Sequence, residues 1–390
     1  MSSHAPATAN KSLFAFYSAG ALREIIPIYP LYSVMFLGNG VSPLELSLLF
    51  IIWASVGLLL EVPSGALADA LSRKWLVVLS GLLKSAAFLT WYFWQDFWGY
   101  ALGFVLWGVG STFRSGAFEA LLYETLKQWD LGSRFAFHYS RIRALSTLAV
   151  LLGEASGGLL ITYGYDVVLL VSAIVPILAT LPFLFYVKDA EKGQDEASSG
   201  FIITALKEAR GNPTLLMILF ISTFLLTVHG IFDEYVPPLF REHGFSLAMI
   251  AYMAIPVFAA QALGEYLADR VPQLPLRQQI GIVALGTLCL IPAALFSGWQ
   301  AVVALTCFFF AFGLASTLIE TQLQHAIKGS ARATVTSIVG LGDSIGAILW
   351  FMLFGVAAEI SSIAGATLLL VVATLLICWF TYWSRFSRQL

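Results

Sequence analysis

The sequence predicts an all-α integral membrane protein, with twelve transmembrane helices in two pseudo-symmetric six-helix bundles and both termini in the cytoplasm. Three observations predict this fold. First, hydrophobic residues make up 59% of the 390 residues and charged residues only 11%, whereas soluble domains carry roughly 25% charged residues. Second, the chain has twelve apolar segments of the length that a bilayer requires, which is about 20 residues. Third, short motifs of the first six segments recur in the last six.

The twelve segments follow one another with short connections. They cover residues 13–38, 44–66, 75–95, 98–122, 139–161, 166–187, 213–240, 246–267, 277–297, 299–322, 333–357 and 362–384. Basic residues give the orientation, because cytoplasmic loops are enriched in Lys and Arg. One set of alternate loops, together with both termini, holds 17 of the 21 Lys and Arg residues, and the opposite set holds Arg241 alone. Both termini are therefore expected in the cytoplasm.

A polar segment separates the two groups of six spans. It begins with the run KDAEKGQDEASSG, which is rich in charged and small residues. The next run, FIITALKEAR, places its apolar residues on one helical face, as in a short amphipathic helix on the inner membrane surface. The predicted domains are an N-terminal six-helix half (1–187), a cytoplasmic linker with this amphipathic helix (188–212) and a C-terminal six-helix half (213–390).

Three short motifs recur at corresponding places in the two halves. They are Leu67-Ala68-Asp69 with Leu267-Ala268-Asp269, Arg143-Ala144 with Arg332-Ala333, and Gly153-Glu154-x-x-Gly157 with Gly342-Asp343-x-x-Gly346. Their common order indicates a parallel six-plus-six repeat. Such repeats place a substrate site between the halves, near the middle of the membrane.

The connection between spans 2 and 3 contains the sequence GALADALSRK at residues 65–74. It resembles the signature loop of the major facilitator superfamily, G-x-L-x-D-x-x-G-R-K/R, with Ser72 in place of the second glycine. The preceding run, EVPSG, is similar to a group of bacterial members described as exporters of drugs or metabolites. Gly153, Gly157 and Gly158 fit part of a span 5 motif of proton antiporters, in which Ser156 replaces a proline. The resemblance implies a secondary active transporter that works by alternating access.

The same loop is expected to form a cytoplasmic gate. A carboxylate can bind the positive N-terminus of a neighbouring helix, and Asp69 is expected to do so at the start of span 11, near Ala333. Arg73 is expected to pair with Glu124, so that both contacts latch the halves in the outward-open state. Gly65 and Lys74 complete this gate, although the enrichment of cytoplasmic loops in basic residues is the preferred explanation for Lys74.

Ionisable residues inside the predicted spans indicate function, because a charged side chain at a helix centre costs about 2.5–3.5 kcal/mol. They are Arg23, Glu24, Lys84, Arg114, Glu119, Glu154, Asp233, Glu234, Glu320 and Asp343. All the cations lie in the first half, and the second half contributes only acids. We therefore expect cations to hold an anionic or polar substrate group, and acids to exchange protons.

These expectations assign residues to two roles. The expected substrate-binding residues are Arg23, Lys84, Arg114, Tyr29, Tyr32 and Tyr235. The expected proton-coupling residues are Glu24, Asp233, Glu234, His229, Asp343 and Glu154. His229 and Asp233 are spaced i, i+4 and would share one helical face. Arg23 and Glu24 are adjacent, point about 100° apart in a helix and are not expected to neutralise each other.

Each assignment has a structural alternative. Arg23, Glu24, Lys84, Asp233 and Glu234 can instead form a buried ion-pair network that holds the bundle together. Glu154 and Asp343 can bond a neighbouring helix, and His229 can be a plain interhelical hydrogen-bonding residue. Two pairs of prolines occupy equivalent places, and proline bends a helix because it removes a backbone hydrogen bond. They are Pro27 and Pro30 in span 1, and Pro237 and Pro238 in span 7.

The sequence therefore predicts a secondary active transporter of the bacterial inner membrane that exports a small organic compound, drug-like or a metabolite, by proton coupling. A proton-coupled importer of a nutrient or siderophore and a lipid flippase of the same fold stay open. No phosphate-binding loop, metal-binding histidine pair or nucleic-acid-binding charge pattern is present in the sequence. We expect neither enzymatic activity nor a cofactor. The expected partners are a small-molecule substrate, protons and the lipid bilayer, and the expected state is a monomer.

Overall fold

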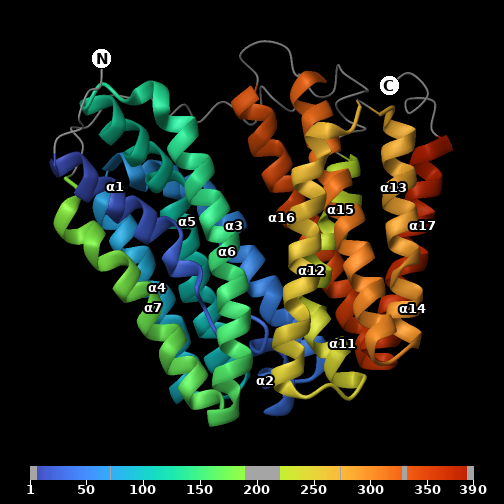
Figure 1. Ribbon diagram of the computed structural model, residues 1–390. Helices are drawn as coiled ribbons and strands as arrows, with labels where there is room; N and C mark the ends of the chain where they lie inside the picture. Colours follow the sequence, from blue (N-terminus) through green and yellow to red (C-terminus); the bar gives the residue numbers. More distant parts are fainter. Residues whose placement is uncertain (1–6, 71, 189–219, 273, 327–331, 384–390) are drawn as a thin grey trace. The chain divides into compact units, whose positions relative to one another are not determined.

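The computed structural model describes residues 7–70, 72–188, 220–272, 274–326 and 332–383, which form helices joined by short connections (Figure 1). No strand occurs among these residues. Nine helical segments of the described part are long and apolar enough to cross a membrane. The all-helical class is thereby confirmed. The count of twelve spans and the cytoplasmic position of both termini stay predictions.

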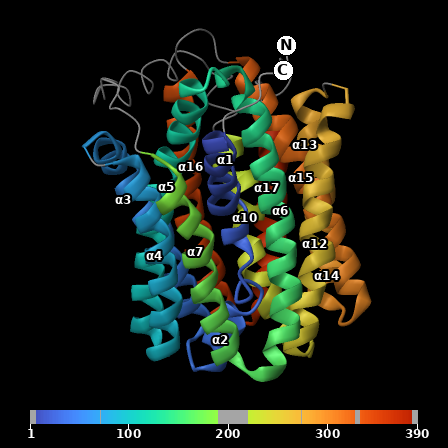
Figure 2. The ribbon, with the colours of Figure 1, turned by 60° about the vertical axis from the view of Figure 1, so that its left-hand side comes forward.

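The first half contains seven α-helices and three 3-10 turns in its described part. They are α1 (Ala7–Gly20), η1 (Leu22–Glu24), α2 (Tyr32–Gly38), α3 (Pro43–Ala70), α4 (Arg73–Phe93), α5 (Phe97–Gln128), η2 (Gly132–Arg134), α6 (Phe135–Leu160), η3 (Ile161–Tyr163) and α7 (Tyr165–Tyr186). α4 packs against both α5 and α7, and α7 also packs against α1 (Figure 2).

The second half begins, in its described part, with a helix made of several short pieces. Its elements are the π-helical turn η4 (Ser222–Leu226), α10 (Thr227–Phe232), the 3-10 turn η5 (Asp233–Tyr235), α11 (Val236–Glu242), α12 (Leu247–Leu267), the 3-10 turn η6 (Ala268–Arg270), α13 (Leu276–Leu288), α14 (Leu290–Leu295), α15 (Trp299–Ala326), α16 (Arg332–Ile360) and α17 (Ile363–Trp383). α15 packs against α12, α13 and α14, and α17 packs against α13, α14 and α16.

The chain divides into two compact units. The first comprises Met1–Gly40 and Ile52–Ala197, and the second comprises Val41–Ile51 and Ser198–Leu390. The start of α3 therefore groups with the second unit. In that unit the Ser47 and Tyr235 hydroxyls share a hydrogen bond of 2.6 Å, and the Leu44 N–H donates to Glu359 Oε2 at 3.1 Å.

Most predicted spans coincide with helices, and their ends agree to within about two helical turns of 3.6 residues each. Spans 1, 7 and 9 differ, because none of them is a continuous α-helix. Span 1 is interrupted between α1 and α2, span 7 contains the π-helical turn η4 and the 3-10 turn η5, and span 9 is divided into α13 and α14. Proline explains part of the first interruption, because Pro27 and Pro30 each lack the N–H that a helix needs. The predicted amphipathic helix lies outside the described residues.

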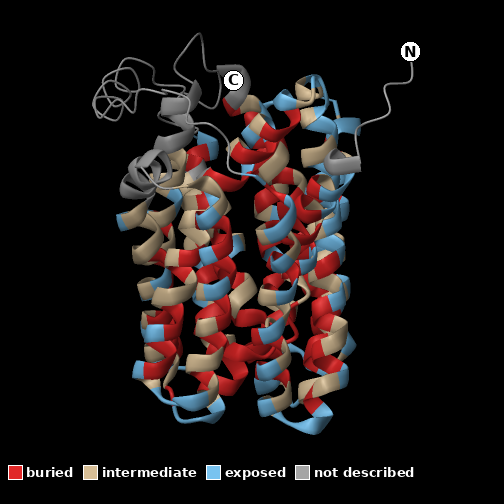
Figure 3. Ribbon diagram, turned by 90° about the vertical axis from the view of Figure 1, so that its left-hand side faces the viewer, coloured by how far each residue is buried: buried red, intermediate tan, exposed pale blue. Residues whose placement is uncertain are grey.

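Exposed residues lie along the helices as well as at their ends (Figure 3), and many of them are large and apolar. Phe93, Leu59 and Ile360 are 78%, 71% and 82% exposed. Soluble monomers rarely expose extended apolar surface, whereas a lipid-facing surface requires it. The first unit contains an apolar core cluster, in which Phe16 makes edge-to-face contacts with Phe118 and Phe183.

Asp96 begins α5 at the connection that follows α4. Its Oδ1 accepts hydrogen bonds from the N–H groups of Trp98 (2.9 Å) and Gly99 (3.1 Å), and its Oδ2 accepts one from Trp94 Nε1 (2.8 Å). These donors, with the Gly99 N–H contributing most, hold the pKa of Asp96 below its ordinary value. Asp96 is thus an N-cap that fixes where α5 starts.

Candidate functional site

The first helix of the chain is broken over residues 21–31, between α1 and α2 (Figure 2). Side chains from other helices bind the backbone groups that the break leaves free. The Gly20 carbonyl accepts hydrogen bonds from Arg114 Nη2 (3.3 Å) and Ser146 Oγ (2.6 Å). The Ile28 N–H donates to Ser172 Oγ at 3.0 Å. Within a membrane an unsatisfied backbone group is costly, so these contacts make the break a stable part of the fold.

Glu24 lies at this break and is the centre of a cluster of polar side chains. Lys84 Nζ and the Tyr29 hydroxyl both donate to Glu24 Oε2 at 2.9 Å. Arg23 Nε lies 3.1 Å from Glu24 Oε1, and Arg23 Nη1 donates to Ser80 Oγ at 3.3 Å. Arg23 and Lys84 are 4% and 2% exposed. Glu24 is thus the carboxylate that both buried cations contact.

Aromatic rings also surround Lys84. Lys84 Nζ lies 5.1 Å from the ring centre of Tyr29 and 5.6 Å from that of Trp107. The two rings are stacked, with centres 5.5 Å apart and an interplanar angle of 12°. Ring faces attract a cation by about 0.5–2 kcal/mol, more when water is excluded. The ammonium group is therefore held by a carboxylate and by two ring faces.

The contact between Arg23 and Glu24 corrects one expectation. Adjacent side chains on an α-helix point about 100° apart and do not meet. Here both residues belong to the 3-10 turn η1, after which the backbone leaves the helical path. The two side chains nevertheless pair, so the expectation that they would not neutralise each other is wrong.

Two glycines of α6 allow the broken segment to pack closely. A Cβ atom on Gly153 would lie 2.8 Å from the Ile26 nitrogen, and one on Gly157 would collide with the Pro27 carbonyl oxygen. Glu154, between them, is 2% exposed. The first copy of the repeated glycine motif thus packs against the break in the first helix.

The second copy of the motif packs in the same way in the second unit. Cβ atoms on Gly342 and Gly346 would collide with the Thr223 side chain and the Thr223 carbonyl oxygen. Thr223 belongs to the π-helical turn η4, and Trp350 Nε1 donates to the carbonyl of its neighbour Phe224 at 3.0 Å. The two units therefore use the same glycine motif against the irregular part of their first helix.

The acidic pair of the second unit also lies at an irregular position. Asp233 and Glu234 form the 3-10 turn η5, directly before the two prolines of α11. Among the described residues, neither Asp233 Oδ1 nor His229 Nε2 has a hydrogen-bond partner, although both atoms are buried. No hydrogen bond therefore joins these two atoms as an i, i+4 relay would. The His229 ring instead contacts the ring of Phe309, with centres 4.9 Å apart.

The repeated acids Glu154 and Asp343 differ in their surroundings. Glu154 is buried in the first unit, whereas Asp343 is exposed on α16. Equivalent positions in the repeat therefore do not have equivalent burial. A proton-coupling role for either residue stays a prediction.

The two remaining tyrosines lie in aromatic packing. Tyr32 is 5% exposed and contacts the rings of Trp91, Phe104 and Trp107. Tyr235 is 0% exposed, and its ring stacks on Phe354 with centres 3.9 Å apart. Substrate contact by these tyrosines stays a prediction.

The predicted gate is described only in part. Arg73 and Glu124 form the ion pair that the sequence predicts. Lys74 lies over the ring of Trp75, with Nζ 5.9 Å from the ring centre. Gly65 and Asp69 lie outside the residues whose side chains the structure describes, as does the start of α16. The gating role of this loop stays a prediction.

Trp107 is the residue of this cluster that the sequence did not single out. A signal was present, because Trp107 and Arg114 are seven residues apart on one helix and thus share a face. Arg114 itself holds the end of α1 and stacks over Phe118, with 4.7 Å between its guanidinium carbon and the ring centre. Within the described part of the chain, no three His, Cys, Asp or Glu side chains are grouped to hold a metal ion.

Comparison with known proteins places this architecture in a family. A crystal structure of a mutant of the nucleoside transporter NupG has a TM-score of 0.80 at 13% identity, over 97% of this chain and 100% of that chain. A bacterial homologue of the human lysosomal transporter Spinster, in an inward-facing and unoccupied conformation, has a TM-score of 0.75 at 16% identity, over 99% of this chain and 98% of that chain. No relative among the curated proteins matches the sequence. The family model of the Major Facilitator Superfamily matches residues 12–351, and the chain belongs to this superfamily of transporters.

Proposed function

We propose that this chain is a proton-coupled secondary transporter that exports a small organic compound bearing an anionic or polar group, by alternating access. The observation that carries the proposal is the polar cluster at the break of the first helix. Two buried cations there share the single carboxylate of Glu24. A negatively polarised substrate group can take the place of the Glu24 carboxylate as the partner of one of these cations.

Substrate binding is proposed to occur by exchange of partners. Lys84 and Arg23 both contact the Glu24 carboxylate, so either cation can turn to a substrate oxygen while the other stays paired with Glu24. The rings of Tyr29 and Trp107 beside Lys84 would pack against the apolar part of the compound. This role favours a compound with both an acceptor group and a hydrophobic body.

Proton exchange is proposed to occur at the acids of the second unit. Asp233 has a carboxyl oxygen that is buried without a hydrogen-bond donor among the described residues. Burial without a donor penalises a carboxylate far more than a neutral carboxyl group. We propose that Asp233 carries the transported proton, with Glu234 as its neighbour in the same turn. The resemblance of the EVPSG run to exporters supports export in exchange for this proton.

The test is transport in liposomes that contain the full-length protein and an imposed pH gradient. A panel of labelled organic anions and nucleosides is screened for movement against their own concentration gradients, driven by the proton gradient. Lys84→Met should lower both net transport and substrate exchange at equal pH. Asp233→Asn should abolish gradient-driven transport but retain exchange at equal pH, because the substrate contacts remain. Lys127→Met and Asp166→Asn, at exposed positions, are the matched controls.

Three outcomes would contradict parts of this proposal. Substrate that moves in the same direction as protons would show import, and would reject export. Flux that is independent of the pH gradient in both the natural protein and Asp233→Asn would reject proton coupling. Scrambling of labelled lipids at the rate of the small compounds would indicate a flippase.

A further inference from the structure

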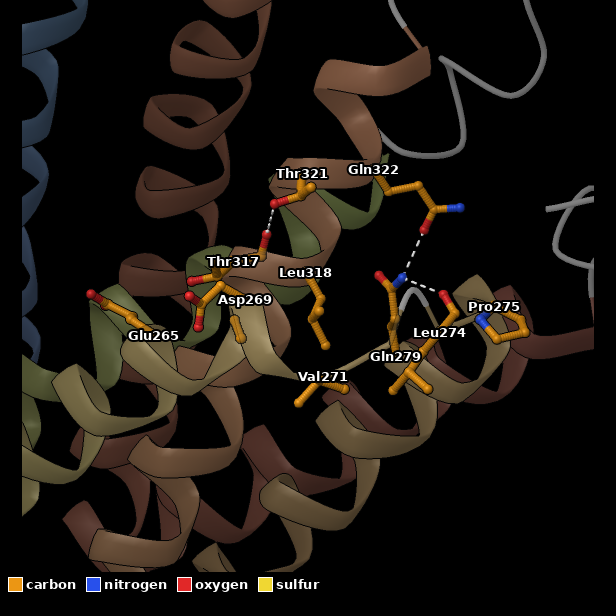
Figure 4. A pocket seen from close by; sticks show the side chains of 11 residues that line it. Glu265, Asp269, Val271, Leu274, Pro275, Gln279, Thr317, Leu318, Thr321 and Gln322 are labelled. Atoms are coloured by element: carbon orange, nitrogen blue, oxygen red, sulfur yellow. Dashed lines mark hydrogen bonds between the residues drawn. The ribbon is translucent and has the colours of Figure 1, made fainter. Parts of the chain in front are cut away.

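The second unit contains a cavity of about 540 Å³ at one end of its helices (Figure 4). It lies where the end of α12 and the turn η6 meet the start of α13 and the last third of α15. Its volume is within the range of small-molecule sites, which is about 300–1,000 Å³. The sequence predicts this end of the helices on the cytoplasmic side. The cavity also includes Asp269, from a repeated motif to which the proposed transport cycle assigns no role.

Gln279 gives the clearest indication that the cavity accepts a ligand. It is 3% exposed, and its Nε2 donates to the Leu274 carbonyl (2.7 Å) and to Gln322 Oε1 (2.9 Å). Its Oε1 is buried and has no hydrogen-bond partner among the described residues. A buried acceptor without a donor is energetically unfavourable. Since Gln279 lines the cavity (Figure 4), a ligand there that offers a hydrogen-bond donor would remove this cost.

The two threonine hydroxyls of the cavity are acceptors as well. The Thr321 hydroxyl donates to the Thr317 carbonyl at 2.7 Å, and the Thr317 hydroxyl donates to the Gly313 carbonyl at 3.1 Å. Both hydroxyl hydrogens are thus used within α15, and only the oxygen lone pairs remain for a ligand. Together with Gln279 Oε1, these oxygens favour a molecule that donates hydrogen bonds.

The charged side chains that line the cavity are both acidic. Glu265 and Asp269 both line it, and both are exposed. Arg270, the basic residue next to Asp269, is engaged elsewhere: its Nη2 donates to the Tyr266 hydroxyl at 2.6 Å, and its guanidinium carbon lies 4.8 Å from that ring centre. Val271 and Leu318 contribute apolar surface. The combination matches a cation with a hydrocarbon body.

We infer that this cavity is a binding site for a small protonated aliphatic amine. The ammonium group donates hydrogen bonds to Gln279 Oε1 and to the threonine oxygens, and it is attracted by Asp269 and Glu265. The alkyl chain packs on Val271 and Leu318. The site is formed by the second unit alone, and it shares no residue with the cluster around Glu24 and Lys84.

The test is calorimetric titration of the full-length protein in lipid nanodiscs with pentylammonium, pentanol and pentanoate. Pentylammonium should bind at least about tenfold more tightly than pentanol, because its hydrogen bonds are charge-assisted, and pentanoate should not bind. Asp269→Asn should weaken pentylammonium binding about two- to fivefold, as expected for a partly solvated charge. Val271→Phe should weaken pentylammonium binding, because the larger ring narrows the cavity beside the alkyl chain. Asp166→Asn removes an exposed acid in the first unit and should leave the affinity unchanged.

Three results would overturn the inference. The first is pentanol binding as tight as that of pentylammonium, which would leave only a non-selective apolar cavity. The second is pentylammonium binding that is unchanged in both Asp269→Asn and Val271→Phe, which would place the amine at another site. Absence of any pentylammonium binding to the natural protein would also reject the site. None of these results tests transport through the cluster around Glu24 and Lys84. Either the amine site or the proposed transport function can therefore be rejected without the other.

Discussion

Glu24 has the central electrostatic role among the buried residues, because it is the carboxylate that both Arg23 and Lys84 contact. Removing one partner of a buried ion pair typically costs about 3–5 kcal/mol, since the remaining charge is uncompensated. The three charges are not equivalent in this respect. Loss of Lys84 leaves Glu24 paired with Arg23, whereas loss of the Glu24 charge leaves two neighbouring cations without a carboxylate.

We therefore predict an order of stabilities. Glu24→Gln should lower the free energy of unfolding by about 3–5 kcal/mol, and Lys84→Met should lower it by less. The double variant Glu24→Gln/Lys84→Met should be more stable than Glu24→Gln alone, because one of the two repelling cations is gone. Reversible unfolding in mixed micelles measures the three values, with Lys127→Met as the exposed control. Additive effects in the double variant would show that the charges do not interact.

Sequence reasoning identified most members of this cluster but not their pairing. The cost of charge in a bilayer singled out Arg23, Glu24 and Lys84. The contact between Glu24 and Lys84 joins residues 60 positions apart, and only the packing of α4 beside the broken helix creates it. A single sequence has no local pattern that encodes such a contact.

At the scale of the element, the glycine motif shows how an irregular helix is accommodated. A broken helix exposes backbone carbonyls along its side, and only a neighbour without a Cβ atom can approach them closely. Gly157 meets the carbonyl of Pro27, and Gly346 meets that of Thr223. The repeat in the sequence thus corresponds to a repeat in packing, although the first break is a 3-10 turn with prolines and the second begins with a π-helical turn.

Alanine substitutions test this role. Gly157→Ala and Gly346→Ala should each destabilise the protein by about 1–3 kcal/mol, as is typical of overpacking. Gly281→Ala in α13 is the control, because nothing lies within 4 Å of the added Cβ. It should stabilise the helix by about 0.5–1 kcal/mol, since glycine is entropically unfavourable there. Thermal unfolding of the three variants measures the differences. Equal effects at all three positions would contradict a packing role for the motif.

The same elements show what hydropathy can and cannot predict. Apolar length determines where a helix crosses a bilayer, which is why most predicted spans coincide with helices of the structure. The prolines of spans 1 and 7 predicted bends at matched places. The extent of the interruption was not predictable, because the free backbone groups are stabilised by side chains from distant helices, such as Ser172 and Trp350.

At the scale of the whole molecule, the second unit is completed by a segment from the first half of the sequence. Val41–Ile51 groups with it, and Phe50 contacts the ring of Phe351 with centres 5.1 Å apart. A Cβ atom on Gly355 would collide with the Ser47 side chain, so this face of α16 is shaped to receive the start of α3. Without the segment, the buried hydroxyl of Tyr235 loses its partner Ser47.

This arrangement predicts the behaviour of a divided protein. A chain of residues 198–390 expressed alone should be less stable than the same residues in the intact protein, because it lacks Val41–Ile51. Loss of one buried hydrogen bond costs about 1–3 kcal/mol, and the lost ring contacts add to this. Co-expression with residues 1–197 should restore the thermal stability of the second fragment, whereas co-expression with a first fragment that carries Ser47→Ala and Phe50→Ala should restore it only in part. Equal rescue by both first fragments would show that Val41–Ile51 is not what the second unit needs.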